Sequence, residues 1–233
     1  MELTIETEKL VRENINALLS PKPVRMEAGI QRLENGMLHV AMRNVLHDCK
    51  GKMLDWWFTY FETTADLKLW HPLDHVAHGG WDSQWIKNEN YIGATIHATE
   101  SLGNIPPVSA TIKFHDPADI FDSVILHQAY ANGDVSAVIY ARIGFGENTP
   151  VDINGDPLDG YMFHIVRDMS QGCVLRSHFF LGALTADSDH QLPDEIGFGL
   201  MEHCYSEFTY LAQALPSLYY AENKNGDKPP LLW

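Results

Sequence analysis

The segment 192–216 constrains the fold most, because it reads as one long amphipathic helix near the C-terminus. Pro193 suits the start of a helix, and Pro216 is expected to end it. The apolar residues recur with the 3.6-residue period of one helix face: Ile196, Leu200, Leu211 and Ala214. A helix with such a stripe must cover an apolar surface, so the rest of the chain has to supply one.

Two ionisable residues of this helix, His203 and Glu207, fall on the same apolar stripe. They are four residues apart, so their side chains lie one above the other. Ionisable groups that face a core need a partner, because an unpaired buried charge is costly. A bound metal ion is one solution, and a His–Glu hydrogen bond inside the core is another.

The middle of the chain changes to the two-residue period of strands. In 91–102 the alternation is clean and places Glu100 on the apolar face, and 108–114 continues the pattern. Two more strands are expected at 160–168 and 173–182. A hairpin around 132–134 is expected to join strands at 123–131 and 135–145.

The first 80 residues predict helices and one hairpin. An amphipathic helix is expected over 4–20, a hairpin over 28–44 around Asn35-Gly36, and a buried helix over 53–61. Thr63 or Thr64 starts a short helix that Pro72 breaks, and Gly79-Gly80 reads as a loop. Helices, then antiparallel strands, then one long helix favour an α+β helix-grip fold, in which a curved sheet wraps the C-terminal helix around a cavity.

Composition narrows the possible functions. The 233 residues are 45% apolar, which suffices for one sizeable core, and the formal net charge of −15 argues against nucleic acid or an anionic membrane as partner. The three cysteines form no CxxC pair, which fits a cytoplasmic protein without disulfides. No apolar run reaches membrane-spanning length. The GxSxG, Walker, GxGxxG and HExxH motifs are all missing, so familiar nucleophile and nucleotide sites are not expected.

Inward-facing ionisable residues from three separate elements remain as the candidate site. They are His203 and Glu207 on the helix, Glu100 on a strand, and His71 or His75 in the WHPLDH segment. Imidazole and carboxylate ligands together suit zinc, manganese or iron. Taken singly, each residue has a structural alternative: the WHPLDH histidine could cap a helix, and Glu100 could pair with an arginine across the sheet.

Five segments, in this order, resemble the 2,4-diacetylphloroglucinol hydrolase family, which includes phloretin hydrolase. They are DWWF, LKLWHPLDH, HATES, the run from His164 to RSHFFLG, and HCYSEF followed by LP, over about residues 50–218. The resemblance implies a Bet v1-like domain over 51–233, preceded by an N-terminal helix and hairpin extension over 1–50. It also implies one zinc ion per chain, a possible homodimer, and hydrolysis of the carbon–carbon bond between an acyl group and a polyhydroxylated ring.

The resemblance also assigns ligands and other site residues. The zinc ligands carried over from the family are His71, Glu100, His203 and Glu207, with His75 as the alternative to His71. Three residues are candidates to position phenolic hydroxyls or to move protons: Asp74, Tyr161 and His164. The family has asparagine where this chain has Asp74, and Thr63 stands near the expected place of a second phenol-binding tyrosine.

The proposed chemistry uses tautomerisation of a hydroxylated ring to accept the electrons of the breaking bond. As the resemblance implies it, a bound zinc ion would lower the pKa of a water molecule and polarise the acyl carbonyl, and attack by that water would release a carboxylic acid. Two other functions use the same features. One is a non-catalytic carrier of aromatic ligands, which needs no metal, and the other is a different metal-assisted enzyme acting on polyketide-like substrates.

Overall fold

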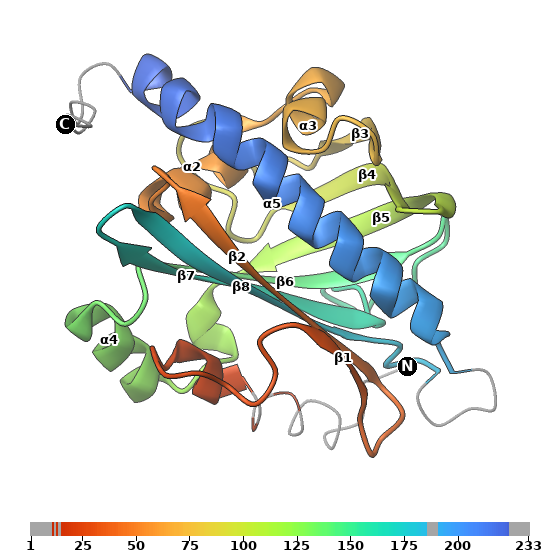
Figure 1. Cartoon of the computed structure of the whole chain (residues 1–233). Helices are drawn as coiled ribbons and strands as arrows, with labels where there is room; N and C mark the ends of the chain where they lie inside the picture. Colours follow the sequence, from red (N-terminus) through yellow and green to blue (C-terminus); the bar gives the residue numbers. More distant parts are fainter. Residues whose placement is uncertain (1–10, 12, 14, 186–190, 224–233) are drawn as a thin grey trace.

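The computed structural model describes residues 11, 13, 15–185 and 191–223, and its centre is one antiparallel sheet (Figure 1). The strand order is β1-β2-β8-β7-β6-β5-β4-β3. The strands are β1 (Gly29–Arg32), β2 (Leu38–His47), β3 (His75–Trp81), β4 (Thr95–Leu102), β5 (Ile105–His115), β6 (Ala137–Phe145), β7 (Gly160–Met169) and β8 (Gly172–Leu181). The helices are α2 (Gly51–Tyr60), α3 (Thr64–Trp70), α4 (Ser123–Asn132) and α5 (Asp194–Glu222), with short 3-10 turns η1 (Asn16–Leu19) and η2 (Pro117–Asp119).

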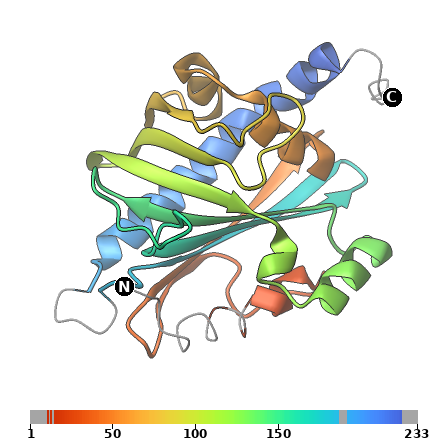
Figure 2. The ribbon, with the colours of Figure 1, turned by 180° about the vertical axis from the view of Figure 1, so that it is seen from behind.

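The long helix α5 runs diagonally across one face of the curved sheet, with α2 and α3 beside it (Figure 1). The opposite face is partly covered by η1 and α4, as the reverse view shows (Figure 2). Buried apolar side chains form one large cluster between the sheet and α5 and a second cluster on the opposite face. The predicted helix-grip arrangement is therefore confirmed. Strands β1 and β2 form one sheet with the six later strands.

Several local predictions are confirmed with their expected causes. The hydroxyl of Thr63 accepts the backbone N–H of Asp66, and the Asp66 side chain accepts the N–H of Thr63, which closes a capping box at the start of α3. The hairpin around Asn35-Gly36 forms between β1 and β2. Much of the helix expected over 4–20 lies outside the described residues; of those described, 11, 13 and 15 are α-helical and lead into η1.

The prediction that Pro216 ends the last helix is wrong, because α5 continues to Glu222. Proline removes the N–H that would bond to the carbonyl one turn earlier. That carbonyl belongs to Ala212, and the thiol of Cys49 lies 3.9 Å from its oxygen and donates to it. Packing against Cys49 thus offsets part of the cost of Pro216.

The hairpin expected over 123–145 is wrong in its first arm, since 123–132 forms α4, whereas the strand expected over 135–145 is β6. The Asp122 carboxylate accepts the N–H groups of Val124 and Ile125 at the start of this helix. Gly133 ends the helix in the left-handed conformation, at φ 72°. Two smaller corrections concern the sheet: 75–81 is strand β3 although it contains Gly79-Gly80, and β4 begins at Thr95 rather than at residue 91.

Candidate metal site

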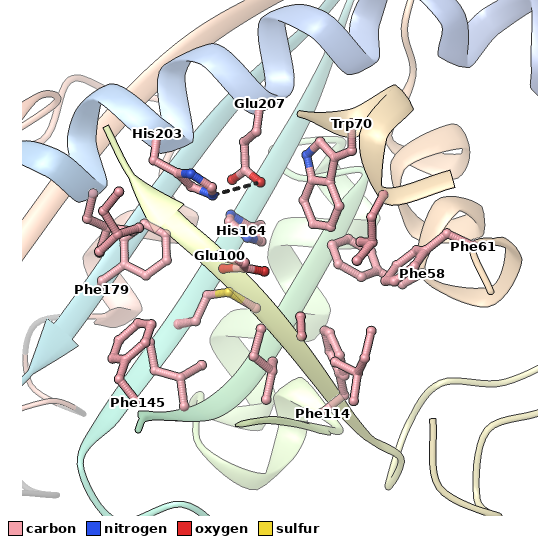
Figure 3. A pocket seen from close by; sticks show the side chains of 18 residues that line it. Phe58, Phe61, Trp70, Glu100, Phe114, Phe145, His164, Phe179, His203 and Glu207 are labelled. Carbon is pink, nitrogen blue, oxygen red and sulfur yellow. Dashed lines mark ion pairs between the residues drawn. The ribbon is translucent and has the colours of Figure 1, made fainter. Parts of the chain in front are cut away.

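A cavity of about 50 Å³ lies between the sheet and α5. Most of its lining is aromatic or aliphatic, and Figure 3 shows phenylalanines surrounding a small polar group of side chains. Among the described residues, the ionisable side chains in the lining are Glu100, His164, His203 and Glu207. Three of these are ligands expected from the sequence, so β4, β7 and α5 do bring the predicted residues to one place.

Close packing of α5 on the sheet places His203 and Glu207 over the cavity. A Cβ atom on Gly199 would lie 2.7 Å from the carbonyl oxygen of Leu102, so only glycine allows this approach. Both ionisable side chains are buried, and His203 Nε2 lies 3.7 Å from Glu207 Oε2. The shared face predicted from the four-residue spacing is therefore confirmed.

His75, at the start of β3, lies near the carboxylates of Glu100 and Glu207. Its Nδ1 lies 2.8 Å from the carbonyl oxygen of Leu67. A carbonyl only accepts, so Nδ1 carries the proton and Nε2 keeps its lone pair in the neutral ring. Nε2 lies 3.7 Å from Glu207 Oε2 and 3.9 Å from Glu100 Oε1. His75 is paired with Glu100 in the β3–β4 register, which explains how the two side chains meet.

His71 is oriented differently, at the C-terminal end of α3. Its Nδ1 accepts the backbone N–H groups of Leu73 and Asp74, at 3.3 Å and 2.9 Å. The proton of the neutral ring is therefore on Nε2, which lies 3.4 Å from Asp74 Oδ2. The same carboxylate oxygen lies 3.2 Å from His203 Nδ1. His71 thus faces Asp74 rather than Glu100 and Glu207.

Within the described residues, two groups of three could hold a metal ion: His71, Asp74 and His203, or His75, His203 and Glu207. A neutral imidazole has one unprotonated nitrogen, so His203 can serve only one of them. In the first group Nδ1 of His203 donates to Asp74, and Nε2 of His71 carries its ring proton 3.4 Å from the same carboxylate oxygen. In the second group both histidines present Nε2 lone pairs. Tetrahedral zinc with ligands at 2.0–2.1 Å requires ligand atoms about 3.3 Å apart. Separations of 3.2 and 3.4 Å in the first group and 3.7 Å in the second both come close to this value, so the free lone pairs, rather than the spacing, favour the second group.

Burial shifts the titration of these groups in a way that suits a cation. Desolvation raises the pKa of Glu207 well above its ordinary value, and the charge of nearby Glu100 adds to the increase. Desolvation also raises the pKa of Glu100. The pKa of His75 is lowered to about 4, mainly by burial, and that of His203 is lowered for the same main reason. The histidines are therefore neutral and ligand-ready, and a cation would stabilise both carboxylates.

His164 enters the cavity from β7, on the side opposite α5. Its Nδ1 lies 2.8 Å from the hydroxyl oxygen of Ser177, its register partner on β8. Nε2 is therefore the ring nitrogen available to a ligand. Burial lowers the pKa of His164 to about 3, so the ring is neutral. Figure 3 shows it among the cavity-lining side chains together with Glu100 and Glu207.

Two other residues proposed from the sequence lie elsewhere. Tyr161 is buried in the second apolar cluster, and the Arg142 guanidinium lies 4.2 Å from the centre of its ring. It precedes Met162, which lines the cavity, so the alternation of the strand turns Tyr161 to the other face. Thr63 is exposed and caps α3. The cavity contains neither side chain.

Comparison with known proteins places these features in a family. Residues 10–220 match the family described as the DAPG hydrolase PhiG domain. Phloretin hydrolase of Eubacterium ramulus is 26% identical over 193 residues, which cover 75% of this chain and 64% of that protein. This chain thus spans less than two thirds of its relative.

Two solved structures are more distant. Ms6760 of Mycobacterium smegmatis has a TM-score of 0.43 at 11% identity, covering 81% of this chain and 96% of that one. Ara h 8.0201 has a TM-score of 0.44 at 12% identity, covering 78% and 99%. In the described part of the chain, no helix has the length and apolar character needed to cross a membrane. The family match extends over most of the sequence, and the chain therefore belongs to the DAPG hydrolase PhiG domain family.

Proposed function

We propose that this protein is a zinc-dependent hydrolase that cleaves the carbon–carbon bond between an acyl group and a polyhydroxylated aromatic ring. The observation that carries the proposal is the convergence of buried histidines and carboxylates on one apolar cavity. Family membership supports the reaction class, and the relative named phloretin hydrolase supports an acylated phenol as substrate. Buried acids in an apolar cavity are costly unless a cation offsets them, so a plain ligand carrier gives no reason for them.

The proposed ligands are His75, Glu100, His203 and Glu207. His75 takes the place that the family resemblance gives to His71, because Nε2 of His75 keeps a free lone pair beside both carboxylates. When bound, zinc would polarise the acyl carbonyl and lower the pKa of a water molecule from 15.7 towards about 7. The four side chains also fix the place at which an acyl group would meet that water.

The apolar lining of the cavity would bind the aromatic ring of the substrate. It excludes bulk water and holds an aromatic ring by its faces. Water adds to the acyl carbon, the bond to the ring breaks, and the electron pair moves onto the ring carbon. Hydroxyls beside that carbon delocalise the charge as an enolate, and the ring carbon then takes a proton. His164 is placed to accept a phenolic hydrogen bond at Nε2 or to pass on that proton. The cavity of about 50 Å³ holds only a few waters, so side chains of the lining must move to admit a ring.

A substrate panel tests the reaction. Zinc-loaded protein is incubated with 2-acylphloroglucinols, an aryl ketone without hydroxyls and an aryl ester. We expect release of the deacylated phenol and one carboxylic acid from the acylphloroglucinols alone, because the unhydroxylated ring cannot accept the electron pair. Cleavage of the ester alone would show an ordinary esterase. No cleavage together with tight binding of the ketones would favour a carrier, and a chain that binds no zinc would rule out the metal site.

A further inference from the structure

The Asp74 carboxylate lies behind the candidate metal site and does not line the cavity. One of its oxygens, Oδ2, accepts two hydrogen bonds and lies near a third nitrogen. His203 Nδ1 and the backbone N–H of Gly103 each lie 3.2 Å from it, and His71 Nε2 lies 3.4 Å from it. We propose that Asp74, supported by His71, is a positioning residue that holds His203 in the orientation and tautomer required for metal binding. This inference rests on the proposed metal site.

The direction of each hydrogen bond follows from the chemistry of the groups. An ionised carboxylate only accepts, so His203 must donate from Nδ1, and its Nε2 then carries the lone pair that faces Glu207. The proton of the neutral His71 ring is on Nε2, which lies 3.4 Å from the same carboxylate oxygen, because Nδ1 already accepts two backbone N–H groups.

The surrounding structure fixes the carboxylate itself. The Asp74 carbonyl accepts the N–H of Ser101, at 2.8 Å, next to Glu100 on β4. The rings of His71 and His203 stack in parallel, 5.0 Å apart with 5° between their planes. Asp74 is therefore tied to α3, β4 and α5 together, and its charge makes the His203 ring a stronger electron donor. Partners of this kind typically account for 10- to 100-fold in metal affinity.

This placement gives the aspartate a different task from a substrate contact. A residue that touches substrate changes KM when it is replaced, and it leaves the affinity for the metal alone unchanged. A residue that orients a ligand changes metal affinity in the absence of any substrate. The two roles can therefore be separated with zinc as the only probe.

The test compares full-length, metal-stripped wild type with Asp74→Asn and Asp74→Ala by zinc competition against a chromogenic chelator at fixed pH. Asparagine keeps the shape and an acceptor oxygen but loses the charge, so we expect about tenfold weaker zinc binding, and up to about 100-fold weaker binding for alanine. Asp156→Asn is the matched control, because its side chain is 16% exposed against 13% for Asp74 and pairs with Lys113 instead. The control should bind zinc as wild type does.

A second measurement does not depend on zinc binding. Ring nitrogen NMR of metal-free, folded wild type should show His203 with its proton on Nδ1, and Asp74→Asn should weaken that preference. Wild-type zinc affinity in both Asp74 variants would overturn the inference, as would a His203 proton on Nε2 in the wild type. A raised KM with unchanged zinc affinity would make Asp74 a substrate contact. If wild type itself binds no zinc, the proposed metal site fails, and this inference fails with it.

Discussion

A pair of buried histidines on the sheet face opposite the cavity should make the protein sensitive to acid. His39 of β2 and His178 of β8 are bonded to each other, with 2.9 Å between Nε2 and Nδ1, and His39 stacks on Phe180. In the part of the chain that the structure describes, Nε2 of His178 is buried without a hydrogen-bond partner. Protonating the pair would add a buried N–H without an acceptor. Burial accordingly lowers the pKa of His39 to about 4 and that of His178 to about 3.

The sign and size of the effect follow from linkage. Both folded-state pKa values lie below the unfolded value of about 6.5, so the unfolded chain binds more protons as the pH falls. Stability from this pair is fully present above pH 6.5 and is lost progressively towards the folded pKa values. At pH 5 the loss is about 2 kcal/mol for each histidine, or about 4 kcal/mol for the pair, since one pKa unit corresponds to about 1.36 kcal/mol.

Urea unfolding at pH 7.5 and pH 5.0, with a chelator present, measures this loss. The double variant His39→Gln, His178→Gln keeps hydrogen-bonding side chains but cannot titrate, so its free energy of unfolding should fall by about 4 kcal/mol less than that of wild type between the two pH values. His127→Gln, at an exposed position of α4, is the control and should behave as wild type. An equal fall in the double variant and the wild type would refute the reasoning.

Three further predictions concern the cavity. His75→Ala should bind zinc roughly 100-fold more weakly than wild type, because one ligand in four contributes about a quarter of a binding free energy of ~10–16 kcal/mol. His71→Ala should lose much less zinc affinity. If a chelator competition assay shows the reverse order, His71 is the ligand instead. Zinc at about 1,000 times its Kd should raise the free energy of unfolding by about 4 kcal/mol, and Glu207→Gln should abolish most of this gain in urea titrations at equal zinc. Ser177→Ala should lower kcat about tenfold with zinc content unchanged, since His164 loses the partner that orients it; wild-type kcat would show that Ser177 has no such role.

The sequence predicted those parts of the fold whose signals are local. Helix α3 was predicted from its capping threonine, the β1–β2 hairpin from Asn35-Gly36, and α5 from its long apolar stripe. The error over α4 arose because Asn-Gly dipeptides mark both hairpins and helix ends. Asp122, a good N-cap ten residues earlier, was the signal that favoured a helix.

Long-range packing determined the parts that could not be read from the sequence. Strand β3 contains two glycines and carries little strand propensity, and a Cβ on Gly79 would lie 2.8 Å from the carbonyl oxygen of His97. The pairing with β4 therefore makes this segment a strand and requires glycine at that position. Where α5 continues past Pro216, the Ala212 carbonyl likewise receives the thiol of Cys49, a partner far away in the sequence.

The same distinction applies to the site. Glu100 could be placed on an inward face from strand parity, and His203 and Glu207 from helix spacing. The choice between His71 and His75 depends on which ring nitrogen is engaged by the backbone, and that is a property of the turn after α3. The order of residues in the sequence does not show which ring nitrogen the backbone engages.

Strand parity carries one more consequence for recognition of the substrate. Residues 161 and 164 are three positions apart on β7, so their side chains must point to opposite faces of the sheet. Tyr161 and His164 therefore cannot share a cavity, and the structure shows which one faces it. Within the described lining, His164 is then the ionisable side chain outside the proposed ligand set that can meet a ring hydroxyl. In the proposed reaction, a phenol held there would place its hydroxyl at the His164 ring and the rest of its ring against phenylalanines, and its acyl group would then reach the proposed metal site.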